Sequence, residues 1–162
     1  MTTFAGAPVT LEGVQLKPGA IMPDFTVTDV NLAQIEPMKS DGTKIILSVP
    51  SADTPVCSRE LATFMHALEG TDVQLISVSM DLPFALKRWM DMEQNDNLTA
   101  TSDFKDHSFA KAAGVRMAEN GLLARAVFVV NPAGEILYDE YVDEVTQEPD
   151  YSKALKAAGI TQ

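Results

Sequence analysis

Pro50-Ser51-Ala52-Asp53-Thr54-Pro55-Val56-Cys57 carries the only cysteine of the 162-residue chain. This stretch follows the apolar run Ile45-Ile46-Leu47-Ser48-Val49, which predicts a buried strand. A helical pattern follows it, because apolar side chains recur at the spacing of one helix face: Cys57, Leu61, Phe64, Met65 and Leu68. The sequence therefore predicts a strand, a short loop and a helix whose first turn contains Cys57.

The helix start favours a reactive thiol at Cys57. Pro55 suits the first helical position, which makes Thr54 the expected N-cap and puts Cys57 three residues after it. The N–H groups of a first turn lack helical partners and the helix dipole favours negative charge there, so a thiolate is stabilised. We expect Cys57 to be nucleophilic near neutral pH, with the Thr54 hydroxyl within reach of the sulfur. The alternative is an inert core cysteine, since buried cysteine commonly behaves as a small hydrophobe.

The spacing Pro50-x-x-x-Thr54-x-x-Cys57 resembles the active-site signature of peroxiredoxins. Longer strings are similar to the thiol peroxidase subfamily of bacterial peroxiredoxins, the atypical two-cysteine type. These strings are Pro8-Val-Thr-Leu-Glu-Gly13, Ser48-Val-Pro-Ser-Ala-Asp-Thr-Pro-Val-Cys57, Val78-Ser-Met-Asp-Leu-Pro-Phe-Ala85, Gly121-Leu-Leu-Ala-Arg-Ala-Val-Phe128 and Val145-Thr-Gln-Glu-Pro-Asp-Tyr151. The resemblance covers essentially the whole chain.

The resemblance implies a thiol-dependent peroxidase that reduces hydrogen peroxide and alkyl hydroperoxides without a cofactor or metal. Cys57 would be the peroxidatic nucleophile and become a sulfenic acid. Thr54 and Arg125 would polarise the peroxide and hold the sulfur anionic, and Pro50 would shield the pocket from water. Such an arrangement suits O–O cleavage, which needs a desolvated thiolate and donors aimed at the leaving oxygen. The implied partners are a thiol reductant, thioredoxin or a small thiol, and a second copy of the chain in a homodimer.

Met90 is the one clear departure from the family pattern. Many thiol peroxidases carry a resolving cysteine in an Arg-aromatic-Cys triplet, and here the triplet is Arg88-Trp89-Met90. A sulfenic acid at Cys57 therefore has no disulfide partner in its own chain. Three explanations stay open: direct reduction by an external thiol, a mixed disulfide with a small thiol or redoxin, or a deliberate replacement of the resolving cysteine.

The composition fits one soluble globular domain spanning residues 1–162, with 46% apolar and 22% charged residues. The net charge of −11 argues against nucleic acid or an anionic membrane as partner. A single cysteine fits the reducing cytoplasm, and the opening Met1-Thr-Thr-Phe-Ala-Gly lacks the features of a signal peptide. His66 and His107 are too isolated to bind a metal together with Cys57.

The pattern along the chain predicts an α/β class. An N-terminal extension, residues 1–17, is expected to hold a β-hairpin within residues 7–16. The other expected strands are residues 25–29, 34–35, 44–49, 73–79, 98–101, 124–130 and 135–142, and the expected helices are residues 55–69, 83–93, 107–113 and 151–158. This order favours a mixed central sheet with helices on both faces, the thioredoxin-like fold. Residues 50–57 then lie at the carboxyl end of a central strand, where open α/β sheets place ligand sites.

Two other functions remain open. Cys57 sulfenylation could alter a partner interface in a peroxide-sensing redox switch without efficient turnover. The chain could also be a silent thioredoxin-fold module.

Overall fold

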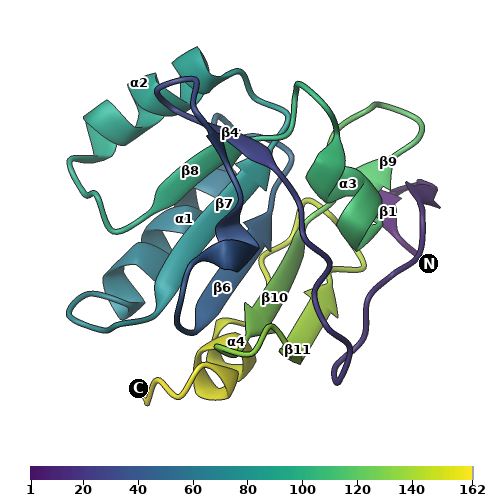
Figure 1. The fold of residues 1–162 in the computed structure, drawn as a ribbon. Helices are drawn as coiled ribbons and strands as arrows, with labels where there is room; N and C mark the ends of the chain where they lie inside the picture. The colour runs from purple at the N-terminus through teal and green to yellow at the C-terminus, as the bar shows by residue number, and fades with distance from the viewer. Residues whose placement is uncertain (162) are drawn as a thin grey trace.

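The fold is organised around a seven-stranded mixed sheet, in the strand order β11-β10-β6-β7-β8-β4-β5 (Figure 1). The structure is a computed structural model and describes residues 1–161. Strands β6, β7 and β8 run parallel, while β10 is antiparallel to β6 and β4 is antiparallel to β8. The strands of this sheet are β4 (Val27–Asp29), β5 (Gln34–Ile35), β6 (Lys44–Ser48), β7 (Gln74–Ser79), β8 (Thr99–Ser102), β10 (Ala126–Val130) and β11 (Ile136–Tyr141).

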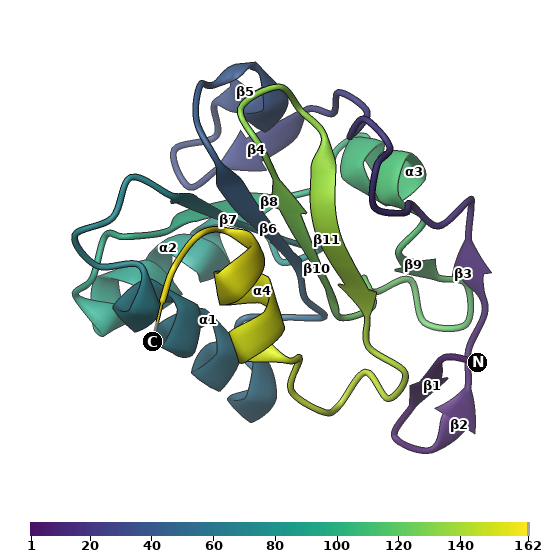
Figure 2. The ribbon, with the colours of Figure 1, turned by 90° about the horizontal axis from the view of Figure 1, so that it is seen from below.

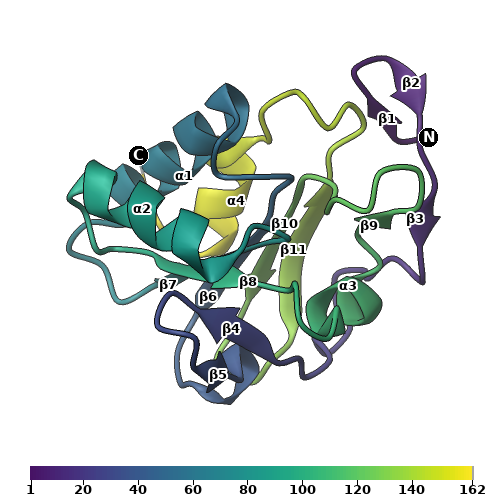
Figure 3. The ribbon, with the colours of Figure 1, turned by 90° about the horizontal axis from the view of Figure 1, so that it is seen from above.

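Helices cover both faces of the sheet, as predicted (Figures 2 and 3). They are η1 (Pro37–Lys39), α1 (Pro55–Ala67), α2 (Pro83–Glu93), α3 (Ser108–Ala113) and α4 (Tyr151–Ala157). Side chains alternate across each strand: in β6, Ile45 and Leu47 pack with α1, α2 and α4, while Ile46 packs with α3. This two-sided burial explains why β10 is apolar throughout and why the middle of β6, residues 45–47, is apolar. The α/β class and the thioredoxin-like arrangement are therefore confirmed.

The prediction of an N-terminal hairpin within residues 7–16 is wrong. The hairpin is formed earlier, by β1 (Thr3–Phe4) and β2 (Ala7–Pro8), around a turn in which Ala5 and Gly6 have φ values of 50° and 84°. Positive φ at both turn residues is the geometry of a tight hairpin turn, and Ala is an unusual residue for it. The next strand, β3 (Leu11–Glu12), pairs instead with β9 (Arg116–Met117), a strand that the sequence pattern did not predict.

The helix α1 begins as its sequence predicts. Thr54 is the N-cap, Pro55 occupies the first helical position, and the Thr54 hydroxyl accepts a hydrogen bond from the Cys57 amide at 3.1 Å. The helix ends at Ala67, two residues before the predicted end. All five residues of the predicted apolar face are buried: Cys57, Leu61, Phe64, Met65 and Leu68.

Candidate active site

Cys57 lies at the start of α1, beneath the loop that leaves the end of β6. Its side chain is 0% exposed, and Pro50, in the loop between β6 and α1, is also buried. The Thr54 hydroxyl accepts from the Cys57 amide and donates to the Ser51 carbonyl at 3.3 Å. The expected contact between this hydroxyl and the sulfur is not among the hydrogen bonds of the described residues. Thr54 therefore fixes the backbone at Cys57, because its hydroxyl binds the amide of the residue that carries the sulfur.

Arg125 is brought to Cys57 by the register of two neighbouring strands. Ala126 of β10 pairs with Ser48 of β6, so the residue before β10 lies beside the end of β6 and the loop that starts at Pro50. The Arg125 Nη2 donates to the Cys57 Sγ at 3.1 Å. Only 2% of Arg125 is exposed, so its guanidinium lies inside the protein and not in a surface ion pair.

The other nitrogens of Arg125 hold the guanidinium in place. Nε donates to the Val145 carbonyl at 2.8 Å, and Nη1 pairs with the Glu60 carboxylate. Burial works to lower the pKa of Arg125, but Glu60 and Cys57 raise it, and the net pKa lies above the ordinary value. The guanidinium thus stays charged in a buried site, with one fork end directed at the sulfur.

Glu60 is a member of the site that the sequence analysis missed. It lies one turn after Cys57 on α1 and is 0% exposed. Burial raises its pKa to about 7, although Arg125 works to lower it. Its second oxygen, Oε1, is buried and has no hydrogen-bond partner within residues 1–161. A carboxylate on the apolar face of a helix, three residues after Cys57, was the available signal, because such a group needs a buried cation.

A Glu60→Gln variant should change how stability depends on pH. The folded pKa of Glu60 is raised from 4.5 to about 7, so the folded chain holds this proton more tightly than the unfolded chain does. The associated stabilisation is present below pH 4.5 and is lost as the pH rises through about 7. Relative to Glu60→Gln, the unfolding free energy of the wild type should fall by about 3 kcal/mol over this range. Urea unfolding at pH 4.5 and at about pH 8 measures it; parallel pH profiles would contradict the assignment.

The loop before α1 is held by a carboxylate from the neighbouring strand. Asp81, just after β7, accepts from the Ser51 hydroxyl at 2.7 Å and from the Ala52 amide at 2.8 Å. Because β6 and β7 are parallel, their carboxyl ends meet at the same edge of the sheet. The sequence analysis did not single out Asp81. Its position directly after a buried strand was the signal.

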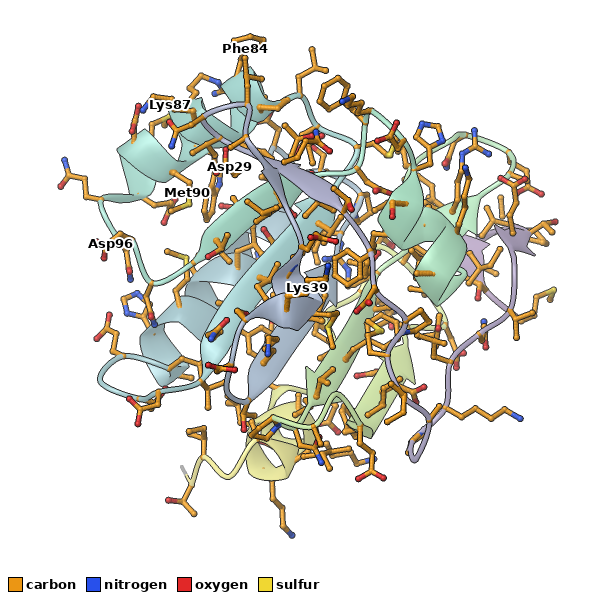
Figure 4. All side chains as sticks on the ribbon, in the orientation of Figure 1. Asp29, Lys39, Phe84, Lys87, Met90 and Asp96 are labelled. Atoms are coloured by element: carbon orange, nitrogen blue, oxygen red, sulfur yellow. The ribbon has the colours of Figure 1, made fainter. Side chains whose placement is uncertain are left out.

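The helix α2 packs beside the start of α1. Arg88 pairs with Asp53 at 2.6 Å, and the Trp89 indole donates to the Ser58 hydroxyl at 3.2 Å. Met90, at the position expected for a resolving cysteine, is half-buried and packs against the core cluster that contains Cys57. Figure 4 shows Phe84 and Lys87 projecting outward from α2, which also carries Met90. Cys57 is a free cysteine, and the chain contains no other.

Glu144 connects the N-terminal hairpin to the segment that holds Arg125. The Glu144 carboxylate accepts from the Thr3 hydroxyl, from the amides of Ala5 and Gly6, and from the amide and hydroxyl of Thr146, at 2.6–3.1 Å. Hydrogen bonds to Thr146, Gly6 and Thr3 lower the pKa of Glu144 to about 2. These contacts hold the hairpin against the segment that follows β11. In Figure 2 the hairpin lies beside the loop that follows β11, which contains Glu144.

A Glu144→Gln variant should slow the oxidation of Cys57 about two- to tenfold without unfolding the core. The amide of Val145, next to Glu144, donates to the Thr3 carbonyl at 2.8 Å, and the Val145 carbonyl receives the Arg125 Nε. Weakening the Glu144 contacts loosens that carbonyl and hence the aim of the guanidinium. Stopped-flow oxidation by peroxide measures the effect. Asp143→Asn is the control, because only the backbone oxygen of exposed Asp143 is used, by Thr3; equal slowing in both variants would refute a positioning role for Glu144.

Other candidate chemistries find no support in the part of the chain that the structure describes. His66 is exposed and pairs with Glu69, while His107 precedes α3 without capping it through its side chain. No group of three or more potential metal ligands occurs within residues 1–161. None of the described helices has the length and apolar character needed to cross a membrane.

The chain is similar to known proteins over nearly its whole length. A family profile described as Redoxin matches residues 17–155. The chain is 42% identical to a thiol peroxidase of Clostridium acetobutylicum over 156 residues, covering 96% of this chain and 95% of that protein. It is 44% identical to a thiol peroxidase of Streptococcus agalactiae over 162 residues, covering 99% of each. Among solved structures, a peroxiredoxin-like protein from Aquifex aeolicus superimposes with a TM-score of 0.92 at 37% identity, covering 98% of this chain and 95% of that one.

Proposed function

Because the chain belongs to the thiol peroxidase subfamily of bacterial peroxiredoxins and is a thiol-dependent peroxidase, we propose that Cys57 is the residue that reduces the peroxide. The observation that carries the proposal is the hydrogen bond of 3.1 Å from the Arg125 Nη2 to the Cys57 Sγ, in a site closed to solvent. A guanidinium in that position favours the thiolate, which is the nucleophilic form of cysteine.

In the proposed reaction, the Cys57 thiolate attacks the hydroxyl oxygen of hydrogen peroxide or an alkyl hydroperoxide. A sulfur–oxygen bond forms, the O–O bond breaks, and the leaving hydroxide or alkoxide takes up a proton, which leaves a sulfenic acid on Cys57. Arg125 stabilises the charge that develops on the leaving oxygen. The Thr54 hydroxyl holds the Cys57 amide, and it exchanges its contact with the Ser51 carbonyl for one with the peroxide when the substrate binds. Pro50 keeps water away from the sulfur.

The sulfenic acid must then be reduced by a thiol from outside the chain, because the chain holds no second cysteine. An external thiol attacks the Cys57 sulfur, water leaves and a mixed disulfide forms. A second thiol then attacks the sulfur of the first thiol in this mixed disulfide, which releases the Cys57 thiol and a disulfide of the two external thiols. The donor is a small thiol or a thioredoxin-type protein. The one-cysteine composition supports the small thiol, because thioredoxin commonly attacks a disulfide that this chain cannot form within itself.

Steady-state peroxide consumption with several thiol donors tests the proposal. An enzyme consumes many equivalents of peroxide per protein molecule, and its rate depends on the donor. The alternative function, a peroxide-sensing switch, predicts one stoichiometric oxidation of Cys57 followed by arrest. Arrest after one equivalent with every donor, small thiols and thioredoxin included, would replace the enzyme assignment by the switch.

We further propose a single domain across residues 1–162, a cytoplasmic location and a homodimer. The free cysteine supports a reducing compartment. The exposed apolar side chains Leu82 and Phe84 at the start of α2, 52% and 69% exposed, support a contact between two copies. Sedimentation velocity should show a dimer that Phe84→Glu weakens. A wild type that stays monomeric over a range of concentrations would contradict the homodimer.

A further inference from the structure

A cavity of about 290 Å³ lies between the first turn of α1 and the helix α2. Thr54 and Ser58, which flank Cys57 in the chain, line one side, and Trp89 and Met92 of α2 line the other. The Trp89 indole donates to the Ser58 hydroxyl across the cavity wall at 3.2 Å. The cavity therefore borders the turn that carries the reactive sulfur, on the side of the helix where a resolving cysteine is missing.

The size of the cavity suits a small molecule. Ligand pockets commonly enclose about 300–1,000 Å³, so this one lies at the lower limit. A low-molecular-weight thiol fits such a volume. Met92 and Trp89 offer apolar contact to the carbon chain and the sulfur of such a thiol.

The charged side chains that line the cavity favour a positively charged ligand. Arg88 is already paired with Asp53 at 2.6 Å, while Glu93 is exposed and has no ion-pair partner within residues 1–161. Among the lining residues Asp53, Arg88 and Glu93, the net charge is thus negative. The whole chain, at −11, adds to the same preference.

Given the proposed peroxidase function, we propose that this cavity binds the reducing thiol, and that the thiol is a small aminothiol whose ammonium group lies at Glu93. The bound thiol supplies the second sulfur that the chain lacks. It attacks the Cys57 sulfenic acid, forms a mixed disulfide and releases water, and a second aminothiol then liberates Cys57 and a small disulfide.

Oxidation prepares the sulfur for this encounter. Cys57 is 0% exposed in the reduced form, so an added oxygen overfills the site and strains the packing around the first turn. One contact that holds this turn in place is the hydrogen bond between Ser58 and Trp89, which joins α1 to α2 beside the cavity. Displacement of that turn toward α2 brings the oxidised sulfur to the bound thiol.

The test compares three probe thiols: cysteamine (a cation), 2-mercaptoethanol (neutral) and 3-mercaptopropionate (an anion). The protein is oxidised with one equivalent of peroxide and mixed with each thiol, and the loss of sulfenic acid is followed by alkylation and mass analysis. Dividing the rate constant of a variant by that of the wild type removes the intrinsic reactivity of each thiol. Glu93→Lys should slow the reduction of the sulfenic acid by cysteamine about three- to tenfold. It should leave reduction by 2-mercaptoethanol unchanged and accelerate reduction by 3-mercaptopropionate.

Asp91→Lys is the matched control, because Asp91 is an exposed carboxylate of the same helix that does not line the cavity. It should leave the three ratios unchanged. The aminothiol site would be overturned if the variant-to-wild-type rate ratio of Glu93→Lys were the same for all three thiols, or if Asp91→Lys showed the same dependence on thiol charge. It would also be overturned if thioredoxin reduced the sulfenic acid faster than cysteamine and Glu93→Lys had no effect. Failure of peroxide to oxidise Cys57 in the first step would overturn the proposed function instead, so the two failures are distinguishable.

Discussion

A Cys57→Ser variant is expected to consume no hydrogen peroxide, whatever thiol donor is supplied. Cys57 is the only cysteine, and a serine hydroxyl stays protonated at neutral pH and does not cleave the O–O bond. The loss should be complete to the limit of a steady-state peroxide assay. Stopped-flow mixing with peroxide should likewise show no oxidation, and mass analysis no added oxygen at residue 57.

A matched control separates sulfur chemistry at Cys57 from sulfur chemistry elsewhere. Met90 packs against the same core cluster, and Met90→Leu removes its sulfur while keeping the volume nearly constant. This variant should keep the peroxide reaction. Circular dichroism should show both variants folded, so that a loss in Cys57→Ser reflects chemistry. Peroxide consumption by Cys57→Ser would refute the assignment of the nucleophile.

Replacing Arg125 by methionine should slow the oxidation of Cys57 about a hundred- to a thousandfold, the range seen when one donor to a developing charge is removed. The hydrogen bond from Nη2 to the sulfur is lost, and with it the cation that favours the thiolate and the leaving oxygen. Arg125→Lys should also be slow, because a single ammonium group cannot reach the sulfur, Glu60 and the Val145 carbonyl together. Stopped-flow kinetics across pH measures both variants.

The Arg125 prediction needs a stability control, because Arg125→Met leaves Glu60 buried without its cation. Breaking a buried ion pair from one side costs about 3–5 kcal/mol, and protonation of Glu60 reduces that cost. Arg125→Met combined with Glu60→Gln should recover most of the lost stability, since no buried charge remains unpaired. The double variant should stay as slow as Arg125→Met. Recovery of the oxidation rate together with the stability would show that Arg125 serves folding and not the reaction.

Local patterns predicted the start of α1 and most of the sheet. Thr54 and Pro55 mark the helix start through their own conformational preferences, so the position of Cys57 in the first turn could be predicted from adjacent residues. The same holds for β6 and β10, whose apolar runs are buried from both sides. Arg125 was found through the resemblance, and the pairing of Ala126 with Ser48 gives the physical reason for its place.

Long-range partners were beyond these patterns. Glu60 looked like any helical carboxylate until the strand register brought Arg125 to it, across 65 residues of sequence. The contacts of Glu144 with the N-terminal hairpin span about 140 residues and depend on a turn at Ala5 that the residue type disfavours. β3 and β9 are each two residues long, too short for a periodic pattern to appear.

Trp89 gives the protein a built-in optical reporter. It is the sole tryptophan of the chain, and its indole N–H donates to Ser58, the residue directly after Cys57. Any displacement of that turn changes the hydrogen bond and the polarity around the ring, and hence the intensity and colour of the emitted light. Each redox state of the sulfur should therefore have its own fluorescence, visible in real time without a label.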